Sequence, residues 1–187
     1  MAASSNPIAP GSQAPDFELR DGHGTPMRLR EHAGARGTLV IFICNHCPYV
    51  LHMRDALEQY ARDYAPRGIS VIGINPNDPV AYPQETPAHV AQVAEHLSFP
   101  YLVDADQKVA QAYDAACTPD LYLYDSDLRL YYHGRFDGTR PGNGRATGAD
   151  LREASNQLLE GSKAFTSPGA SIGCSIKWKR GNDPQRP

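Results

Sequence analysis

The sequence lacks the features that mark membrane, secreted and nucleic-acid-binding proteins. No run in its 187 residues approaches the roughly 20 consecutive apolar residues that a membrane-spanning helix requires. The first residues, MAASSNPIAP, have neither a basic start nor an apolar stretch, so they do not resemble a signal peptide. The net charge is only −3, which favours neither nucleic acid nor an anionic membrane as a partner. We therefore expect a cytoplasmic protein that binds no nucleic acid and no membrane.

Cysteine is scarce, with four residues at positions 44, 47, 117 and 174. Structural disulfides are rare in a reducing compartment, so we do not expect these cysteines to form them. We expect catalytic, redox-sensing or metal-binding roles instead. The place of each cysteine relative to the predicted strands and helices therefore decides what it can do.

The hydrophobic pattern predicts a single α/β domain. Residues 39–43 (LVIFI) form a continuous apolar run, which is typical of a central strand buried on both faces. Further strands are predicted at 69–74, 101–103, 121–124 and 128–132, and helices at 48–64, 89–97, 107–113 and 147–159. Four prolines make residues 75–88 an irregular loop. The alternation of strands and helices, ending in a hairpin, indicates a mixed β-sheet flanked by helices.

The two ends of the chain differ in composition from the rest. Residues 1–10 are small or proline, without periodicity, and predict a flexible leader. Residues 163–187 are rich in Pro, Gly and Lys and predict an extended tail that packs on the domain. Residues 11–162 then form the domain itself.

Cys47 stands at the predicted start of a helix. Proline is favoured at the first helical position, so Pro48 places Cys47 at the N-cap. Free backbone N–H groups and the positive end of the helix dipole meet there. Such a site stabilises a thiolate and should lower the pKa of Cys47 below its usual value of about 8.5. His46 next to it can add positive charge when protonated. Cys47 is therefore the predicted nucleophile.

Cys44 precedes Cys47 by three residues and forms a C-x-x-C pair with it. Such a pair beside a strand–helix unit is typical of a redox motif, although here the second cysteine, not the first, stands at the helix start. Cys44 could equally be a small buried hydrophobe at the end of a strand. Zinc is not expected, because no second ligand pair follows at a recognisable spacing. A soft ion such as Cu(I), held by Cys44, Cys47 and His46, is the alternative from another functional class.

Five segments together resemble the thioredoxin-like superfamily, and more narrowly its bacterial peroxiredoxin-like branch related to alkyl hydroperoxide reductase and thiol-specific antioxidant. The segments are GSQAPDFEL at 11–19, FICNHCPYV at 42–50, ACTPDLYLYD at 116–125, GRFDGTRPGNG at 134–144 and GCSIKWKRGN at 173–182. The resemblance implies a thioredoxin-like fold with an N-terminal extension and an extended C-terminal tail. It also implies that Cys47 is the redox nucleophile, that Thr118-Pro119 is a cis dipeptide facing it, and that no bound cofactor is required.

Three positions depart from the family patterns that this chain resembles. A thioredoxin has its second cysteine where this chain has Val50. A typical peroxiredoxin has a threonine at the position of Cys44 and a proline at the position of Val40. That threonine hydrogen-bonds the peroxide in typical peroxiredoxins. We therefore do not expect the full activity of either a thioredoxin or a peroxiredoxin in this chain.

Three further residues are candidates for the site. If the turn at Pro119 faces the nucleophile, Cys117 lies close to Cys47 and could resolve an oxidised Cys47; otherwise it only packs. Cys174 in the tail is a second candidate for a resolving thiol, or else a packed residue that anchors the tail. Arg135 could hold a thiolate or a peroxide oxygen by its charge, although such an arginine more often anchors a loop.

These residues predict an enzyme, a thiol-disulfide oxidoreductase or a thiol peroxidase that reduces peroxides through Cys47. Its partners would be a disulfide or peroxide substrate and an external dithiol reductant, and a homodimer is compatible with the sequence. The alternatives are a redox-sensing or copper-binding protein without turnover, and a scaffold that kept the fold and lost the activity.

Overall fold

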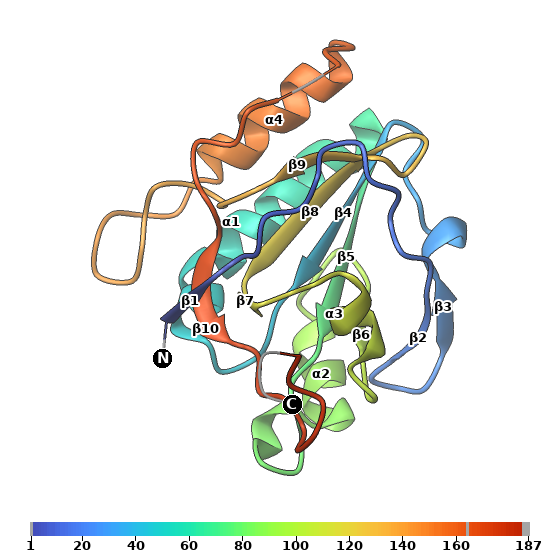
Figure 1. The fold of residues 1–187 in the computed structure, drawn as a ribbon, viewed down its shortest axis with the longest axis vertical. Coiled ribbons are helices and arrows are strands. Elements are labelled where there is room, and N and C mark those ends of the chain that lie inside the picture. The colour runs from blue at the N-terminus through green and yellow to red at the C-terminus, as the bar shows by residue number, and fades with distance from the viewer. Residues whose placement is uncertain (1, 164, 185–187) are drawn as a thin grey trace.

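The computed structural model describes residues 2–163 and 165–184, which form a layered α/β structure (Figure 1). The strands are β1 Ala2–Ser4, β2 Glu18–Asp21, β3 Pro26–Arg28, β4 Gly37–Phe42, β5 Ile69–Asn75, β6 Tyr101–Val103, β7 Cys117–Thr118, β8 Asp120–Asp125, β9 Leu130–His133 and β10 Ile172–Ser175. The helices are α1 Pro48–Tyr64, α2 Pro87–Ala94, α3 Lys108–Ala112 and α4 Ala149–Leu159, with short 3-10 turns at Leu29–Glu31, Ala65–Arg67 and Pro83–Glu85. Within the described residues, the main sheet has the order β3-β2-β6-β5-β4-β8-β9 and a smaller sheet the order β1-β10-β7.

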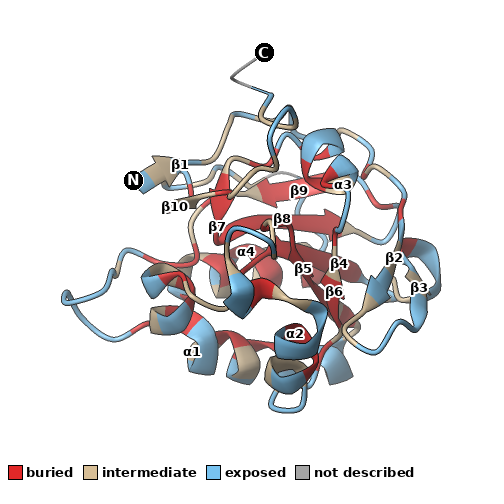
Figure 2. Ribbon diagram, turned by 90° about the horizontal axis from the view of Figure 1, so that it is seen from below, coloured by how far each residue is buried: buried red, intermediate tan, exposed pale blue. Residues whose placement is uncertain are grey.

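The main sheet is mixed, as the sequence predicts, because β4 pairs with β5 in parallel and with β8 antiparallel. Every residue of β4 is buried, since layers cover both faces of the sheet (Figure 2). Leu39 and Ile41 face the layer of α1, α2 and α4, whereas Val40 and Phe42 face α3 and the N-terminal segment. Successive side chains of a strand point to opposite faces, so a strand covered on both sides must be apolar throughout.

Helix α1 has the predicted bounds and connects β4 to β5. Its buried residues are Val50, Met53, Leu57, Tyr60, Ala61 and Tyr64. This spacing of three and four residues places them on one stripe against the sheet. The helix ends at Tyr64, where Pro66 and then Gly68, with a φ of 91°, turn the chain into β5. The sequence pattern therefore positions both ends of the helix that carries Cys47.

The smaller sheet joins the two ends of the chain. Residues of β1 pair with β10, and β10 pairs on its other side with β7, both antiparallel. The structure here differs from the predicted flexible leader of residues 1–10. The reason is tertiary: β10 offers a row of backbone N–H and C=O groups along its free edge, and these can bind an extended segment of any side-chain composition.

Short strands account for most of the elements that the sequence did not predict. The hairpin of β2 and β3 lies at the edge of the main sheet and is largely exposed, so its residues carry no apolar alternation. The strands β7 and β10 are also short, and each is held in its extended conformation by pairing with the other. Among the described residues, no helix combines the length and apolar character needed to cross a membrane.

Candidate active site

Cys47 occupies the N-cap of α1, with φ −70° and ψ 122°, and Pro48 is the first helical residue. Its carbonyl accepts the hydrogen bond of Leu51 N–H at 2.9 Å, the first backbone bond of the helix. The free N–H groups of the first helical turn therefore lie at the same end of α1 as Cys47. Cys47 itself is fully buried, with no exposed surface. The predicted N-cap position of Cys47 is confirmed, and other parts of the chain cover this residue.

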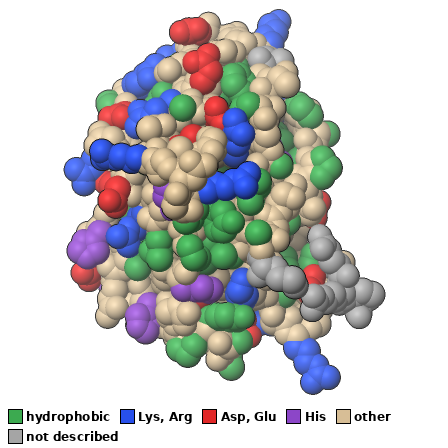
Figure 3. Space-filling model, turned by 90° about the vertical axis from the view of Figure 1, so that its left-hand side faces the viewer, with side chains coloured by type: hydrophobic (Ala, Val, Ile, Leu, Met, Phe, Trp, Pro, Cys, Tyr) green, Lys and Arg blue, Asp and Glu red, His purple; other side chains and the backbone are tan. Residues whose placement is uncertain are grey.

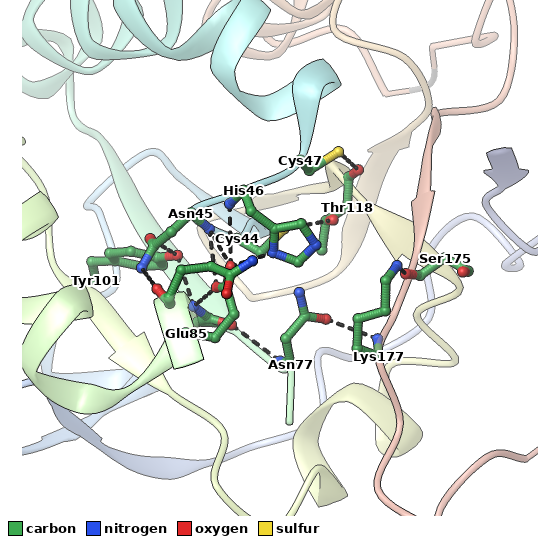
Figure 4. Close-up of polar contacts among 12 residues, drawn as sticks. Cys44, Asn45, His46, Cys47, Asn77, Glu85, Tyr101, Thr118, Ser175 and Lys177 are labelled. Carbon is green, nitrogen blue, oxygen red and sulfur yellow. Dashed lines mark hydrogen bonds and ion pairs between the residues drawn. The ribbon is translucent and has the colours of Figure 1, made fainter. Parts of the chain in front are cut away.

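The peptide bond between Thr118 and Pro119 is cis, and this turn faces Cys47 (Figure 4). The Cys47 Sγ donates a hydrogen bond to the carbonyl of Thr118 at 3.0 Å. The Thr118 hydroxyl contacts the Cys44 Sγ at 3.2 Å. Both cysteines of the C-x-x-C pair are thus held against one residue of the turn.

The surroundings of Cys47 favour its ionised form. A hydrogen bond with the Cys44 thiol lowers the pKa of Cys47 well below its usual range, and the Cys174 thiol and the backbone N–H groups of Val50 and Cys174 add to this effect against the cost of burial. The same hydrogen bond raises the pKa of Cys44, as does its burial. A thiolate cannot donate to the Thr118 carbonyl, so only the protonated thiol of Cys47 makes that hydrogen bond.

A buried carboxylate, Glu85, holds the loop between β4 and α1 (Figure 4). It accepts the backbone N–H of Asn45 at 3.0 Å and that of His46 at 3.1 Å. The Nδ1 of His46 lies 2.5 Å from the same carboxylate, and Asn75 donates its side-chain amide at 2.6 Å. The imidazole of His46 also stacks on Tyr82, with ring centroids 5.2 Å apart. His46 therefore shapes the site through Glu85, not through direct contact with Cys47.

The polar network continues from Glu85 into the main sheet. The Asn75 amide also donates to the hydroxyl of Tyr101 at 3.1 Å, and that hydroxyl donates to the Asn45 side chain at 3.0 Å. Sequence reasoning missed Glu85, Asn75 and Tyr101. Glu85 lies in the proline-rich loop predicted to be irregular, and nothing in its local pattern distinguishes it from an exposed glutamate.

The arrangement of Cys44, His46 and Glu85 bears on the copper alternative. Their ligand atoms lie within 4.8 Å of one another, and among the described residues this is the single group of that kind. Both oxygens of Glu85, however, already accept hydrogen bonds from backbone and side-chain donors. Cys47, which the copper hypothesis included, does not belong to the group. These residues fit a hydrogen-bonded support for the loop better than a set of metal ligands.

The other two cysteines approach the site from different elements. Cys174 in β10 lies opposite Thr118 in the pairing of β10 with β7, and the Thr118 carbonyl accepts the hydrogen bond of the Cys47 thiol. Cys117 is fully buried and directs its thiol to the carbonyl of Pro119 at 3.4 Å. Burial raises the pKa of Cys117. Both cysteines therefore lie at the turn that Cys47 contacts, and the Cys174 thiol helps to lower the pKa of Cys47.

Arg135, the remaining sequence candidate, forms an ion pair with Asp150 at 2.6 Å. It lines a cavity of about 200 Å³ together with Pro119, Tyr49 and His52. The face of the molecule that carries β1 and the loop after β9 shows hydrophobic side chains at its centre with basic ones around them (Figure 3). Because the guanidinium of Arg135 is paired with Asp150, its charge is not directed at the Cys47 sulfur.

Comparison with known proteins identifies the family of this chain. The model of the AhpC/TSA family matches residues 10–133. The thiol-disulfide oxidoreductase ResA of Geobacillus thermodenitrificans is 27% identical over 125 residues, which cover 66% of this chain and 67% of ResA. A Mycobacterium tuberculosis protein named as a candidate peroxiredoxin is 26% identical over 115 residues, which cover 62% of this chain and 69% of that protein.

Solved structures extend the similarity over the whole chain. A conserved protein of Geobacillus kaustophilus has a TM-score of 0.92 and 46% identity, covering 96% of this chain and 97% of its own. A Sinorhizobium meliloti protein has a TM-score of 0.92 and 49% identity, covering 95% and 99%. A thiol:disulfide interchange protein DsbE of Chlorobium tepidum, at 18% identity and a TM-score of 0.65, shares the fold. The chain therefore belongs to the AhpC/TSA family, has a thioredoxin-like fold and is a thiol-dependent oxidoreductase.

Proposed function

We propose that this protein is a thiol-disulfide oxidoreductase in which the thiolate of Cys47 attacks a disulfide. The observation that carries the proposal is the pair of sulfur atoms at the start of α1. Cys44 stays protonated and donates its hydrogen to the Cys47 sulfur, so the charge is concentrated on the residue at the N-terminus of the helix. A low thiol pKa at a helix N-terminus is the usual device for making a reactive cysteine.

The reaction follows from this distribution of charge. The Cys47 thiolate attacks one sulfur of the substrate disulfide and forms a mixed disulfide with it. The substrate's S–S bond breaks, and its second sulfur leaves as a thiolate that takes a proton from the solvent. A second thiol then attacks the sulfur of Cys47 and expels the first substrate sulfur. The substrate has gained two electrons, and an external dithiol restores the two reduced cysteines.

The site supports a disulfide better than a peroxide as the substrate. When a thiolate attacks one oxygen of a peroxide, the O–O bond breaks and the other oxygen leaves with negative charge. Hydrogen-bond donors are needed to stabilise that leaving oxygen. The Cys44 thiol, three residues before the nucleophile, is already engaged with Cys47 and Thr118. The guanidinium of Arg135 is held by Asp150. A disulfide needs less support, because its leaving group is a thiolate that carries its own charge easily.

The test is a direct competition between the two substrates. Fully reduced protein is mixed in separate experiments with glutathione disulfide and with hydrogen peroxide, and the loss of Cys47 thiol is followed by mass spectrometry. We expect reaction with the disulfide to be the faster by at least tenfold. Cys47→Ser should abolish it, whereas Cys117→Ser, which removes a thiol directed at Pro119, should not. Faster oxidation by peroxide, with a sulfenic acid on Cys47, would instead make the protein a thiol peroxidase.

A further inference from the structure

We propose that Cys174 is a catalytic residue, the thiol that resolves the mixed disulfide on Cys47, and that the strand β10 carrying it opens and closes over the nucleophile during each cycle. This inference rests on the proposed disulfide exchange and names its second thiol. It starts from the position of β10 in the C-terminal tail, which lies between β1 and β7 (Figure 1).

The backbone pairing places Cys174 directly at the reacting sulfur. In the ladder between β10 and β7, Cys174 lies opposite Thr118. Thr118 is also the residue whose carbonyl accepts the hydrogen bond of the Cys47 thiol. The thiol and the backbone N–H of Cys174 also contribute to lowering the pKa of Cys47. Because both cysteines meet the same residue of the turn, Cys174 is placed to attack the sulfur of Cys47.

The residue before Cys174 is shaped for this approach. A Cβ atom at Gly173 would lie 2.1 Å from the carbonyl oxygen of Thr118 and 2.5 Å from its carbonyl carbon. Real Cβ contacts are never so short, so any side chain at 173 would push β10 away from the turn at Pro119. Glycine therefore lets the tail come close enough for Cys174 to reach Cys47.

Cys174 is better suited than Cys44 to attack at this point. Only a thiolate attacks a disulfide, so the resolving thiol must lose its proton. Cys44 is almost fully buried beside the carboxylate of Glu85, which opposes a second negative charge. Cys174 is half-buried, so its proton can pass to solvent, and Lys177 favours its anion although burial raises the pKa of Cys174 to about 11. Cys44 then acts as the hydrogen-bond donor to Cys47, and Cys174 as the attacker.

The burial of Cys47 gives β10 its second role. Cys47 has no exposed surface, and β10 packs against the turn beside it. A disulfide can reach Cys47 only if that strand moves aside. Among the described residues, the three-residue strand β1 is the only strand that pairs with β10 on the side away from β7. The tail is held again at Lys177, whose N–H donates to the Asn77 side chain at 2.9 Å. When β10 moves away from the turn, the substrate can reach Cys47. When β10 returns, Cys174 comes back to the mixed disulfide.

The closing step balances as a simple exchange. The Cys174 thiolate attacks the Cys47 sulfur of the mixed disulfide, so a Cys47–Cys174 bond forms and the bond from Cys47 to the substrate breaks. The substrate leaves as a thiolate and is protonated. The protein has lost two electrons to the substrate, and the external dithiol of the proposed function returns them.

The experiment is a single turnover with an aromatic disulfide that releases a coloured thiolate. Reduced full-length protein is mixed with a small excess of this reagent, and the bonds formed are mapped by mass spectrometry. We expect two coloured thiolates per molecule from the unaltered protein, with a Cys47–Cys174 bond. Cys174→Ser should still release the first thiolate but release the second at least tenfold more slowly, leaving the aromatic group on Cys47. Cys44→Ser should still release both.

Controls separate this inference from the proposed function and from effects on folding. Ser175→Ala changes the next residue of β10 and should behave as the unaltered protein, and thermal unfolding shows whether Cys174→Ser remains folded. A Cys44–Cys47 bond in the unaltered protein, or trapping by Cys44→Ser in place of Cys174→Ser, would overturn the role of Cys174 and leave the proposed function intact. No first release, or no dependence of that release on Cys47, would contradict the proposed function itself.

Discussion

The two thiols that lower the pKa of Cys47 come from regions of opposite character. Cys44 belongs to the loop between β4 and α1, which the buried carboxylate of Glu85 holds by hydrogen bonds to consecutive backbone N–H groups. Cys174 belongs to β10, a four-residue strand of the smaller sheet, three residues of which are only partly buried. One side of the nucleophile is anchored in the main sheet, and the other is attached by a few hydrogen bonds at the periphery.

The contrast explains how one cysteine can be both stabilised and covered. The anchored side must keep a fixed geometry, because the pKa of Cys47 depends on a donor at a defined position. The peripheral side can be released at smaller cost, since β10 has four residues in a three-stranded sheet, and such small units open locally below the free energy of global unfolding. Changes on the two sides should therefore have different effects, the first on stability and ionisation and the second on access.

The largest effect is expected from the anchored side. Glu85→Ala removes the acceptor of two backbone N–H groups and of the Asn75 side chain. Unsatisfied buried donors cost about 1–3 kcal/mol each, so we expect the free energy of unfolding to fall by about 3 kcal/mol. Urea unfolding measures it. Glu95→Ala, at an exposed glutamate on the segment after α2, is the control and should change it by less than about 0.5 kcal/mol. Equal effects of the two would contradict the anchoring role.

Cys44→Ala tests the donor on the same side. Loss of the Cys44 hydrogen bond should raise the pKa of Cys47 towards the usual value of about 8.5, where only a few per cent of a thiol is ionised at neutral pH. The rate of alkylation by iodoacetamide at neutral pH should fall by about tenfold or more, since one pKa unit is worth about 1.4 kcal/mol. Its pH profile should shift to higher pH. A profile identical to that of Cys117→Ala would show that Cys44 is not the donor.

The lowered pKa of Cys47 also predicts the direction of a pH effect on stability. Between the lowered pKa of the folded state and about 8.5 in the unfolded chain, the unfolded state binds one more proton. The stabilising contribution therefore grows as the pH rises through this window and levels off above it, and acidification removes it. The difference in unfolding free energy between the unaltered protein and Cys47→Ser should follow this curve, measured by urea unfolding at several pH values. A difference that shrinks with rising pH would refute the assignment.

Gly173→Ala acts on the peripheral side. The added Cβ meets the Thr118 carbonyl, so β10 should separate from β7 while the main sheet stays intact. We expect a several-fold increase in the alkylation rate of Cys47 with little loss of global stability. Gly138→Ala is the matched control, because a Cβ there has no neighbour closer than 3.9 Å. Unchanged access to Cys47 would mean that β10 does not control entry.

The smallest effect is expected from Arg135. Its ion pair with Asp150 is partly exposed, and exposed pairs contribute about 1 kcal/mol or less. Because the Arg135 guanidinium is bound to Asp150 and not to Cys47, Arg135→Gln should leave the alkylation rate of Cys47 within about twofold of that of the unaltered protein. A larger loss of rate with peroxide as the oxidant would restore Arg135 as a residue that holds the attacking sulfur or the peroxide.

Much of the fold followed from short-range pattern. The buried run at 39–43, the helix at 48–64 and the strand at 101–103 lie within a residue or two of their predicted places. Periodicity identifies such elements because each one presents its own apolar face to the core. The smaller sheet was not predicted, since β1, β7 and β10 are two to four residues long and β1 pairs with β10 across almost the entire chain.

What the sequence determined alone is the position of Cys47 at the start of a helix. A cysteine directly before a proline at a helix start meets free N–H groups whatever surrounds the helix, so this position was predictable from the neighbours of Cys47. What only the tertiary structure decided is which groups act on it. Glu85 reaches His46 across 39 positions and Thr118 reaches Cys47 across 71, and Cys174 arrives from the opposite end of the chain. Contacts over such separations depend on the packing of the whole fold, and no local pattern in one sequence encodes them.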